Sequence, residues 1–437
     1  MKSTITIRKT GINGEGIGYL NKIPVFVSGA LIDETVEVDI VDSDKNYKTG
    51  KIKRIIKRSP KRIKPVCENY SYCGGCSLMH TDYPNQLEIK RELLMEALGK
   101  YADIDQEFDI VPSNKTLHYR NSLKLPFTYR NGRLSLGIYN EGSNTIRAID
   151  SCLVHSELLE RLKGEILEIL NRHNLGAYDR KTRKGLRYLV LREIGKRAHL
   201  CIVTGDDVIR KEIVDEIDGI KEIVSIYQCI NTSRNTNSLF SNRMVHLAGG
   251  KHLSFKIDDL RMNLSVRSFF QLNTDQAKRL YRYVSELIDD NQNLIVEAYS
   301  GIGAMSLLQR DKAKEIVGIE CIEDAVVNAN INARNNKAEN VHFICGDAAE
   351  VLVKEFRKRH IDTLIVDPPR SGLDDEMIDA LMNCDIDRII YISCNPSTLG
   401  KNLDILLSRY SIDSIKAFDM FPNTSHIESV TVLTRDR

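Results

Sequence analysis

The feature that most limits the fold of this chain is a regular alternation of short apolar runs and helical stretches, which begins near residue 265. The apolar runs are LIVEAY, EIVGIE, VHFIC, DTLIVD and RIIYIS. Such an alternation is typical of a doubly wound parallel sheet with helices on both faces. The last segment, SIDSIKAFDMFPNTSHIESVTVLTR, predicts two more strands joined by a long connection. We therefore predict an α/β fold for residues 263–437, closed by an antiparallel pair of strands.

Residues 1–58 show a different pattern, with five short β-rich runs separated by Gly, Asn and Asp. The runs are TITIRKTG, EGIGYL, IPVFVSG, ETVEVDIVDSD and TGKIKRII. They predict a small OB-like barrel, a shape that often binds oligonucleotides. The net charge of the chain is only +2, but the stretch from Lys45 to Val66 holds ten Lys or Arg and no acid. This stretch is either a solvated linker face or a nucleic-acid contact surface.

Two further regions lie between the barrel and the sheet. Residues 59–107 hold three cysteines and a predicted helix, YPNQLEIKRELLMEALGKY, and residues 108–262 predict a mixed α/β domain on the substrate side. Strand candidates there are LSLGIYN, LRYLVLRE, AHLCIVTG and VSIYQCIN, and ELLERLKGEILEILNRHN is a helix candidate. No run of about 18 apolar residues predicts a membrane span. The N-terminal MKSTITIRKT lacks the apolar core of a secretory signal, so we expect a cytoplasmic protein.

A cofactor site is predicted at the carboxyl ends of the parallel strands, where open α/β sheets bind ligands. The first strand runs into Ser300-Gly301-Ile302-Gly303-Ala304, where glycines let the backbone approach a ligand. The second strand ends in Glu320, which can accept both hydroxyls of a ribose. Asp347 follows the third strand, where it can reach an adenine amine, and Asp367 ends the fourth. The missing third glycine and the lack of a Walker pattern favour S-adenosylmethionine over NAD or ATP.

A thiol and a carboxylate are candidates for catalysis at the same end of the sheet. Cys394 follows the fifth strand in a polar Ser-Cys-Asn-Pro turn. A lone cysteine is more often a buried apolar residue, but its position in a polar turn favours reactivity. Glu428, in His-Ile-Glu-Ser before the last strand, is the candidate base, although taken alone it would be an exposed acid. One accessible thiol and one base are what covalent activation of a pyrimidine ring requires.

Several motifs together resemble the RNA uridine-5-methyltransferase family over essentially the whole chain. SFFQLN, EAYSGIGAMSL, DPPRSGL, SCNPSTL and HIES occur in that order. The resemblance implies a class I, Rossmann-like methyltransferase sheet, with Cys394 as the nucleophile and Glu428 as the base. Residues 1–58 resemble the RNA-binding TRAM domain. The chain departs from the family at Ser300 and Ala304, so a cofactor contact made there by an Asn in relatives is lost or made by backbone. The implied ligands of S-adenosylmethionine are Gln271, Tyr299, Glu320, Asp347 and Asp367.

Three cysteines lie close together in Cys67-x5-Cys73-x2-Cys76, and Cys152 is the candidate for a fourth ligand. Four thiolates suit either a tetrahedral zinc or an iron–sulfur cluster. The spacing differs from the paired CxxC motifs of a zinc ribbon. It resembles the [4Fe-4S] site of the ribosomal-RNA branch of the family, so the resemblance implies a 23S rRNA substrate, with zinc as the alternative metal.

Other functions remain open at this point. A transfer-RNA enzyme with the same chemistry is the nearest alternative, because the catalytic motifs do not separate the two substrates. An amino-group methyltransferase would explain the Asp-Pro-Pro motif, but Arg370 stands where that class has an aromatic residue. A non-catalytic RNA-binding or redox protein would leave Cys394 and Glu428 unexplained. We expect RNA as the partner, no membrane, and a monomer.

Overall fold

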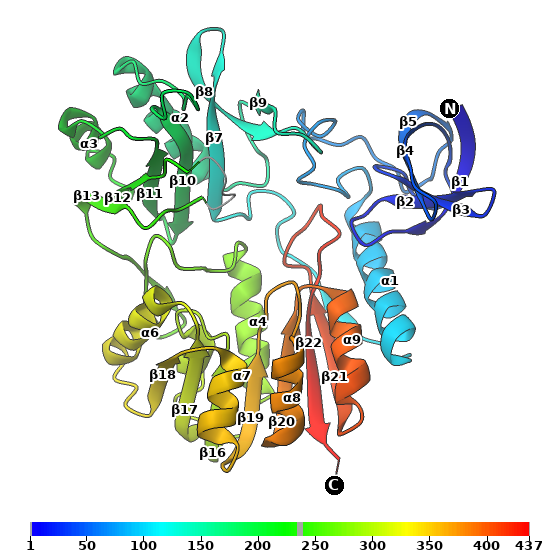
Figure 1. The fold of residues 1–437 in the computed structure, drawn as a ribbon, viewed down its shortest axis with the longest axis vertical. Coiled ribbons are helices and arrows are strands. Elements are labelled where there is room, and N and C mark those ends of the chain that lie inside the picture. Colours follow the sequence, from blue (N-terminus) through cyan, green and yellow to red (C-terminus); the bar gives the residue numbers. More distant parts are fainter. Residues whose placement is uncertain (1, 234–238, 437) are drawn as a thin grey trace. The chain divides into compact units, whose positions relative to one another are not determined.

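The computed structural model describes residues 2–233 and 239–436 (Figure 1). The chain divides into two compact units, each of which is described by itself. The first unit contains the chain up to Thr116, Pro368–Met382 and the chain from Ile390 onward. The second unit contains Leu117–Asp367 and Asn383–Ile389.

A closed five-stranded barrel begins the first unit. Its strands are hydrogen-bonded in the order β1-β2-β3-β5-β4, and alternate side chains such as Ile7, Val25 and Val36 fill its interior. Alternation with period two puts these apolar residues on one side of each strand, which is why the predicted barrel forms. The five predicted strands are confirmed as β1 (Lys2–Thr10), β2 (Gly16–Leu20), β3 (Ile23–Val27), β4 (Thr35–Ser43) and β5 (Lys48–Lys57).

The rest of the first unit consists of helices and strands from distant parts of the sequence. The predicted helix is α1 (Tyr83–Ala102), which begins after Asp82, whose side chain accepts a hydrogen bond of 2.9 Å from the backbone of Asn85. The predicted closing pair is confirmed, because β21 and β22 run antiparallel. A short strand, β6, pairs parallel with β21 and was not predicted. The other elements are β6 (Asp109–Val111), α8 (Asp375–Asn383), α9 (Pro396–Leu406), β21 (Tyr410–Phe418) and β22 (Glu428–Arg435).

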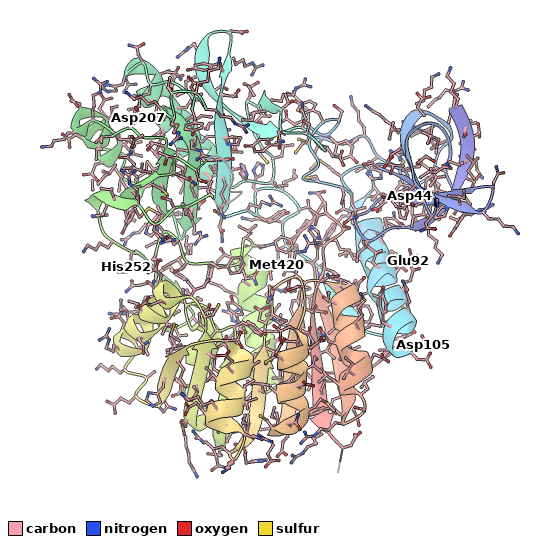
Figure 2. The ribbon with its side chains drawn as sticks, viewed as in Figure 1. Asp44, Glu92, Asp105, Asp207, His252 and Met420 are labelled. Carbon is pink, nitrogen blue, oxygen red and sulfur yellow. The ribbon has the colours of Figure 1, made fainter. Side chains whose placement is uncertain are left out.

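Buried side chains fill this unit beyond the barrel. Glu92 lies on α1 and Met420 in the connection after β21, as Figure 2 shows. Met420 is fully buried, whereas Glu92 lies on a more exposed side of its helix.

Among the residues that the structure describes, no helix is long and apolar enough to cross a membrane.

A seven-stranded sheet forms the first part of the second unit, in the order β13-β12-β11-β10-β7-β8-β9. Two helices, α2 and α3, pack on one face, where leucines and isoleucines of both helices and of the strands form one core. The strands are β7 (Ser122–Arg130), β8 (Arg133–Tyr139), β9 (Ile146–Ala148), β10 (Leu186–Ile194), β11 (Arg197–Thr204), β12 (Ile223–Ile230) and β13 (Met244–Gly249), and the helices are α2 (Glu157–Arg172) and α3 (Lys211–Asp218).

The second unit also holds four parallel strands in the order β18-β17-β16-β19, as the alternating pattern predicted. The fifth predicted strand is β20 (Asp385–Ser393), whose residues belong partly to each unit. The remaining elements are β14 (Leu253–Ile257), β15 (Leu260–Leu264), α4 (Thr274–Glu286), β16 (Gln292–Ala298), α5 (Ala304–Leu308), β17 (Ala313–Glu320), α6 (Glu323–Asn335), β18 (Val341–Cys345), α7 (Ala348–Val351), η1 (Leu352–Phe356) and β19 (His360–Val366).

Candidate active site

The parallel strands of the second unit end level with one another. Ala298, the last residue of β16, lies opposite Ile319 of β17 and opposite Val366 of β19. The residues that follow these three in the chain are therefore brought to the same edge of the sheet. All three were predicted from the sequence as cofactor ligands: Tyr299, Glu320 and Asp367.

The two glycines of the turn after β16 have different surroundings, which the sequence did not distinguish. Tyr299 and Gly301 both have positive φ, +65° and +54°, a conformation that is uncommon for a tyrosine and is often found at functional sites. A Cβ added at Gly301 would meet nothing within 4 Å, so this glycine faces open space where a ligand fits. A Cβ at Gly303 would instead lie 2.3 Å from the ring of Phe343. Gly303 therefore makes room for a neighbouring side chain, and only Gly301 is placed to approach a ligand.

Glu320 is held in one orientation by the backbone. One carboxylate oxygen accepts a hydrogen bond of 3.0 Å from the amide of Gly301, and the other accepts one of 2.9 Å from the amide of Ile322. The oxygen bonded to Gly301 keeps a lone pair for another donor, because an ionised carboxylate has about four acceptor positions. The other oxygen also accepts a weak hydrogen bond of 3.5 Å from the thiol of Cys321, which a ligand hydroxyl can replace. This carboxylate can therefore accept the two hydroxyls of a ribose, which fits the nucleoside part of S-adenosylmethionine.

Two other predicted ligands have structural tasks as well. Asp347 caps α7, and one of its oxygens accepts hydrogen bonds from the amides of Ala349 (3.0 Å) and Glu350 (3.2 Å). Gln271 does not follow one of the parallel strands but lies in the turn before α4, and its backbone carbonyl accepts a hydrogen bond of 2.8 Å from the side chain of Asn121. Both keep side-chain atoms that can bind a ligand, but only Asp347 belongs to the edge formed by the parallel strands.

Burial perturbs the acids along the middle of this edge. Burial raises the pKa of Asp367 to about 7. Burial also raises the pKa of Glu297, on β16, to about 8, although Ser306 donates hydrogen bonds to it and favours its charged form. The negative charges of Asp367 and Glu320 add to this shift. A positively charged ligand favours the ionised forms of such buried acids, so this edge of the sheet suits a positively charged ligand.

Cys394 lies at the end of β20 in the first unit, where the neighbouring residues hold the turn. Asn395 caps α9 by accepting a hydrogen bond of 3.1 Å from the amide of Ser397, and its side-chain amide donates one of 2.9 Å to the carbonyl of Arg370. Cys394 is partly exposed and directly precedes this cap. The positive end of a helix dipole favours negative charge near it, so the position suits a thiolate.

A hydrogen bond joins the chain beside the predicted base, Glu428, to the chain beside Cys394. The hydroxyl of Ser429 donates a hydrogen bond of 3.3 Å to the carbonyl of Ser393, which joins the residue after Glu428 to the residue before Cys394. Glu428 is the first residue of β22 and is only 3% exposed. The acid is therefore buried, whereas the sequence position alone predicted an exposed strand-end residue.

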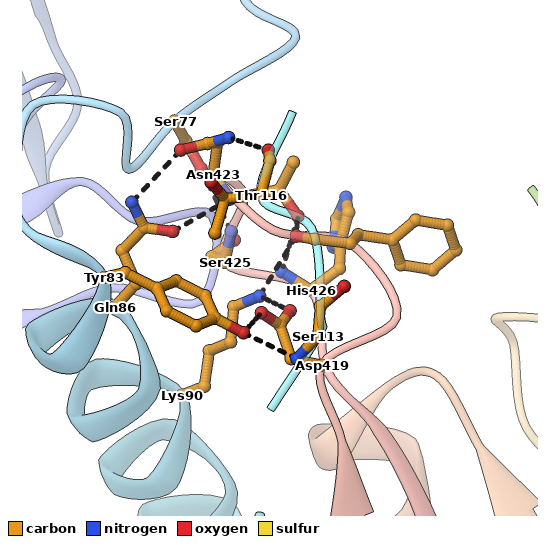
Figure 3. A network of polar contacts seen from close by, with 12 residues as sticks. Ser77, Tyr83, Gln86, Lys90, Ser113, Thr116, Asp419, Asn423, Ser425 and His426 are labelled. Carbon is orange, nitrogen blue, oxygen red and sulfur yellow. Dashed lines mark hydrogen bonds and ion pairs between the residues drawn. The ribbon is translucent and has the colours of Figure 1, made fainter. Parts of the chain in front are cut away.

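A network of buried polar side chains holds the connection that leads into Glu428 (Figure 3). Lys90 of α1 forms an ion pair with Asp419, and both side chains are fully buried. The hydroxyl of Tyr83 donates a hydrogen bond of 2.8 Å to the other oxygen of Asp419. Gln86 exchanges two hydrogen bonds with Asn423, of 3.1 and 2.8 Å. Because breaking a buried ion pair typically costs about 3–5 kcal/mol, this connection is strongly fixed.

Arg370 and His426 are polar residues near the Cys394 turn to which the sequence assigned no role. The guanidinium of Arg370 lies 3.5 Å from Nδ1 of His426. His426 stands two residues before Glu428 in the chain. The backbone carbonyl of Arg370 accepts the hydrogen bond from Asn395, the residue after Cys394. Their place in the Asp-Pro-Pro-Arg and His-Ile-Glu-Ser motifs is the signal that could have singled them out.

The cysteine segment of the first unit consists of tight turns between the barrel and α1. Cys67, Cys73 and Cys76 are all of intermediate exposure. Within residues 2–233 and 239–436, no group of three or more His, Cys, Asp or Glu side chains is arranged to hold a metal ion. The placement of these side chains therefore does not support the predicted cluster, whose ligands remain predictions from the spacing of the cysteines.

Cys152, the proposed fourth ligand, belongs to the second unit and lies beside His155. Burial would raise the pKa of the Cys152 thiol, but the hydrogen bond and charge of His155 lower it below its ordinary value. Nδ1 of His155 lies in turn 2.8 Å from Glu160. The imidazole of His155 therefore interacts with both the carboxylate of Glu160 and the thiol of Cys152.

Two family models match this chain. The model of the tRNA (uracil-5-)-methyltransferase family matches residues 82–436, which is more than half of the chain. The model of the TRAM domain matches residues 2–53, which contain most of the barrel. The two matches together include the strand-end edge, Cys394 and Glu428.

Relatives of known sequence and structure extend over the same length. An uncharacterized RNA methyltransferase of Listeria innocua is 34% identical over 453 residues, which cover 99% of this chain and 98% of the relative. One of Clostridium tetani is 32% identical over 454 residues, with 99% and 98% covered. A solved structure of the Pyrococcus abyssi tRNA (uracil-54, C5)-methyltransferase with S-adenosyl-L-homocysteine is similar with a TM-score of 0.80 and 29% identity, and 99% of each chain is covered.

Proposed function

Because the chain belongs to the tRNA (uracil-5-)-methyltransferase family, we propose that it methylates carbon 5 of a uridine in 23S rRNA through a covalent bond between Cys394 and the uracil ring. Methylation of uracil in RNA with S-adenosylmethionine is the activity of the family. The RNA and the covalent step are the parts that we propose. The observation that carries the covalent step is the hydrogen bond between Ser429 and Ser393, which joins the chain beside Glu428 to the chain beside Cys394.

The first step of the proposed chemistry uses the thiolate of Cys394. Carbon 5 of uracil is too weak a nucleophile to take a methyl group unaided. When the Cys394 sulfur bonds to carbon 6, the electrons of the double bond move toward the carbonyl oxygen, and carbon 5 of the resulting enolate becomes nucleophilic. S-adenosylmethionine, when bound, would supply a methyl group on a positively charged sulfur. Carbon 5 would bond to that methyl carbon as the methyl–sulfur bond breaks, and the electron pair would stay on the sulfur, which becomes a neutral thioether.

The second step uses the carboxylate of Glu428. Carbon 5 now carries both the methyl group and its original proton, which Glu428 removes. The electrons left at carbon 5 re-form the double bond to carbon 6, and the bond between carbon 6 and the Cys394 sulfur breaks. The thiolate is regenerated and the product leaves as 5-methyluridine. The buried polar network that fixes the connection before Glu428 supports this role, because a base must be held in place to act.

The residues proposed to hold S-adenosylmethionine are those predicted from the sequence. Glu320 fits the ribose hydroxyls, and the carboxylates at the strand ends fit a positively charged ligand. Tyr299, Asp347 and Asp367 lie at the same edge, and Gln271 is the fifth proposed ligand. The reaction requires this edge and Cys394 to act on one uridine.

A ribosomal substrate is proposed on two features of the sequence, the barrel and the cysteine segment. The second candidate is a tRNA uridine, and the Pyrococcus abyssi tRNA (uracil-54, C5)-methyltransferase is the observation that favours it. The two candidates share their chemistry, so they differ only in which RNA loses its methyl group when the enzyme is absent.

Deletion of the gene is expected to remove 5-methyluridine from one position or a few positions of 23S rRNA. Mass spectrometry of nucleosides from purified rRNA and tRNA of the deletion strain measures the loss, and primer extension or fragment mapping locates the nucleotide. A strain that expresses the Cys394→Ala variant from a plasmid is the matched control, because it restores the protein without the proposed nucleophile. Loss confined to tRNA would make the tRNA candidate correct, and unchanged 5-methyluridine in both RNAs would contradict the proposed function.

The proposal includes a [4Fe-4S] cluster held by Cys67, Cys73, Cys76 and Cys152. Its support is the spacing of the cysteines and their partial exposure, whereas Cys201, Cys229 and Cys384 are buried. We expect protein purified without oxygen to carry about four iron and four sulfide ions per chain and to absorb broadly in the visible range. A cluster would act in structure or RNA docking, because the methyl transfer moves no electrons between redox states.

Replacing Cys73 with serine is expected to remove most of the iron, while Cys229→Ser, which changes a buried thiol, keeps it. Iron, sulfide and zinc are measured by elemental and colorimetric assays on the same samples. Zinc in place of iron would make zinc the correct metal, and neither metal above background would contradict a metal site here.

The proposed domain boundaries are 1–58, 59–107, 108–262 and 263–437. We also propose a cytoplasmic location and a monomeric state. They rest on the patterns of the sequence, and analytical ultracentrifugation of the purified protein tests the last of them.

A further inference from the structure

The seven-stranded sheet of the second unit has one face that α2 and α3 do not cover. Along β10, Leu189 and Leu191 point into the core beneath those helices, so Val190 and Arg192 point to the opposite face. The same alternation puts Lys124 of β7 and His199 of β11 on that opposite face.

The strand register brings these side chains together. Arg192 lies opposite His199 across the β10–β11 pair, and Lys124 lies opposite Val190 across the β7–β10 pair. Directly opposite side chains on one face of a sheet lie close enough to interact. The three polar residues line one cavity, whose other lining residues are Val190, Phe240, Val266, Arg267, Ser268 and Phe269.

The charge of this cavity is positive and unbalanced. No acidic residue lines it, and among the described residues Lys124 and Arg192 form no ion pair, whereas Arg267 lies 3.5 Å from Asp324. Burial lowers the pKa of Arg192 to about 10, and burial together with the charge of Arg192 lowers the pKa of Lys124. The guanidinium of Arg192 donates a hydrogen bond to the carbonyl of Ser268, but no carboxylate balances its charge or that of Lys124. Cations without a counter-charge at a partly buried site favour an anion.

His199 adds an uncharged hydrogen-bonding group to the cavity. The ring is only 2% exposed, and neither ring nitrogen makes a hydrogen bond of good geometry within the described residues. Burial lowers its pKa to about 4, although the backbone of His252 lies near enough to favour the charged form. A buried polar group without a good partner costs free energy, which a bound ligand can recover.

We propose that Lys124, Arg192 and His199 bind one phosphate group of the substrate RNA. This inference rests on the proposed function, which supplies RNA as the polyanion that the enzyme meets. Phosphates are the groups of RNA that lysine, arginine and backbone or ring N–H donors bind. Phe269 is 69% exposed at the same cavity, so a base next to the bound phosphate has an aromatic surface to stack on. Phe269 stands two residues before Gln271, a proposed ligand of S-adenosylmethionine. The site therefore fixes the register of the RNA at this point of the chain.

The test combines a protein variant with a change in the RNA. Lys124→Met removes the charge and keeps the length of an exposed side chain, and Lys211→Met on α3 is the matched control on the helix-covered side of the sheet. Fluorescence anisotropy at several salt concentrations measures binding of the RNA fragment that the enzyme methylates. In parallel, single phosphates of the fragment are replaced by uncharged methylphosphonates.

Lys124→Met is expected to weaken RNA binding about tenfold and to lower the slope of log affinity against log salt by about one, with S-adenosylmethionine binding unchanged. One methylphosphonate is expected to weaken binding by wild-type protein but not by Lys124→Met, because both remove the same contact. If Lys124→Met behaves like Lys211→Met, or if every methylphosphonate weakens both proteins equally, the phosphate site is wrong while the proposed function stands. A wild-type protein that methylates no RNA would overturn the proposed function, and this inference with it.

Discussion

Replacing Cys394 with alanine is expected to lower the rate of RNA methylation by about 10,000-fold or more, because removal of a covalent nucleophile abolishes the step on which the others depend. Cys394 is partly exposed in a turn before α9, so the substitution leaves no large cavity and the protein should fold. Transfer of tritium from labelled S-adenosylmethionine to RNA measures the rate. Calorimetry with S-adenosylmethionine should show unchanged affinity, since no proposed cofactor ligand is altered.

The matched control for this variant is Cys384→Ala, which removes a fully buried thiol from the residue before β20. It is expected to keep near wild-type methylation with a modest loss of stability. If Cys394→Ala retains the activity of Cys384→Ala, the covalent mechanism is wrong and direct methyl transfer must be considered.

The covalent bond itself is expected to appear with RNA that carries 5-fluorouridine at the target position. Fluorine at carbon 5 cannot leave as a proton, so elimination stops after methyl transfer and the RNA stays bonded to Cys394. A denaturing gel should show a protein–RNA band that needs both S-adenosylmethionine and the thiol. The absence of this band with wild-type protein would count against Cys394 as the nucleophile.

The second large effect is expected for Glu428→Gln, which keeps the shape of a buried side chain but removes the base. Turnover should fall by about 100- to 10,000-fold, the usual contribution of a positioned acid or base. The reaction should stop after methylation, so the methylated RNA remains bonded to Cys394 with its proton still on carbon 5. Mass spectrometry of the digested complex should find the Cys394 peptide joined to a nucleotide that is one methyl group heavier than uridine.

The position of the block separates this role from a structural one. A variant that is merely unfolded or loosened loses both RNA binding and adduct formation, whereas Glu428→Gln should accumulate the adduct with ordinary, unfluorinated RNA. Glu286→Gln, at the exposed end of α4, is the control and should turn over normally. Loss of activity in Glu428→Gln without any accumulated adduct would assign the proton removal to another group.

Most strands of the molecule were predictable because their side chains repeat with a clear period. VHFIC coincides with β18, and the five runs of the barrel each overlap a strand. The central β7 was not among the predicted strands, although Leu123, Leu125 and Phe127 alternate there, because Pro126 interrupts the run. Strand β6 has three residues, too few for any period, and it forms because β21 offers it a pairing edge.

The site residues likewise differ in how far the sequence could predict them, because some depend on the local pattern and others on contacts between distant residues. Glu320 and Asp367 were predictable because Glu320 ends an apolar strand and Asp367 directly follows one. The pairing of Lys90 with Asp419 was not, because 329 residues separate them and a lysine within a helix ordinarily indicates a solvated position. The same holds for Asn395 and Arg370, whose contact depends on the turn that each occupies.

The sequence by itself determined the class of fold and the order of the strand-end carboxylates, and it predicts which thiol and which acid take part in the chemistry. These follow from period, composition and spacing along one chain, which are local properties. Only the tertiary structure decided that Glu428 is buried, that Gly301 and not Gly303 faces open space, and that Lys124, Arg192 and His199 share one cavity. The reason is that burial, close approach and unbalanced charge depend on which distant residues are brought together, and no period in the sequence records that.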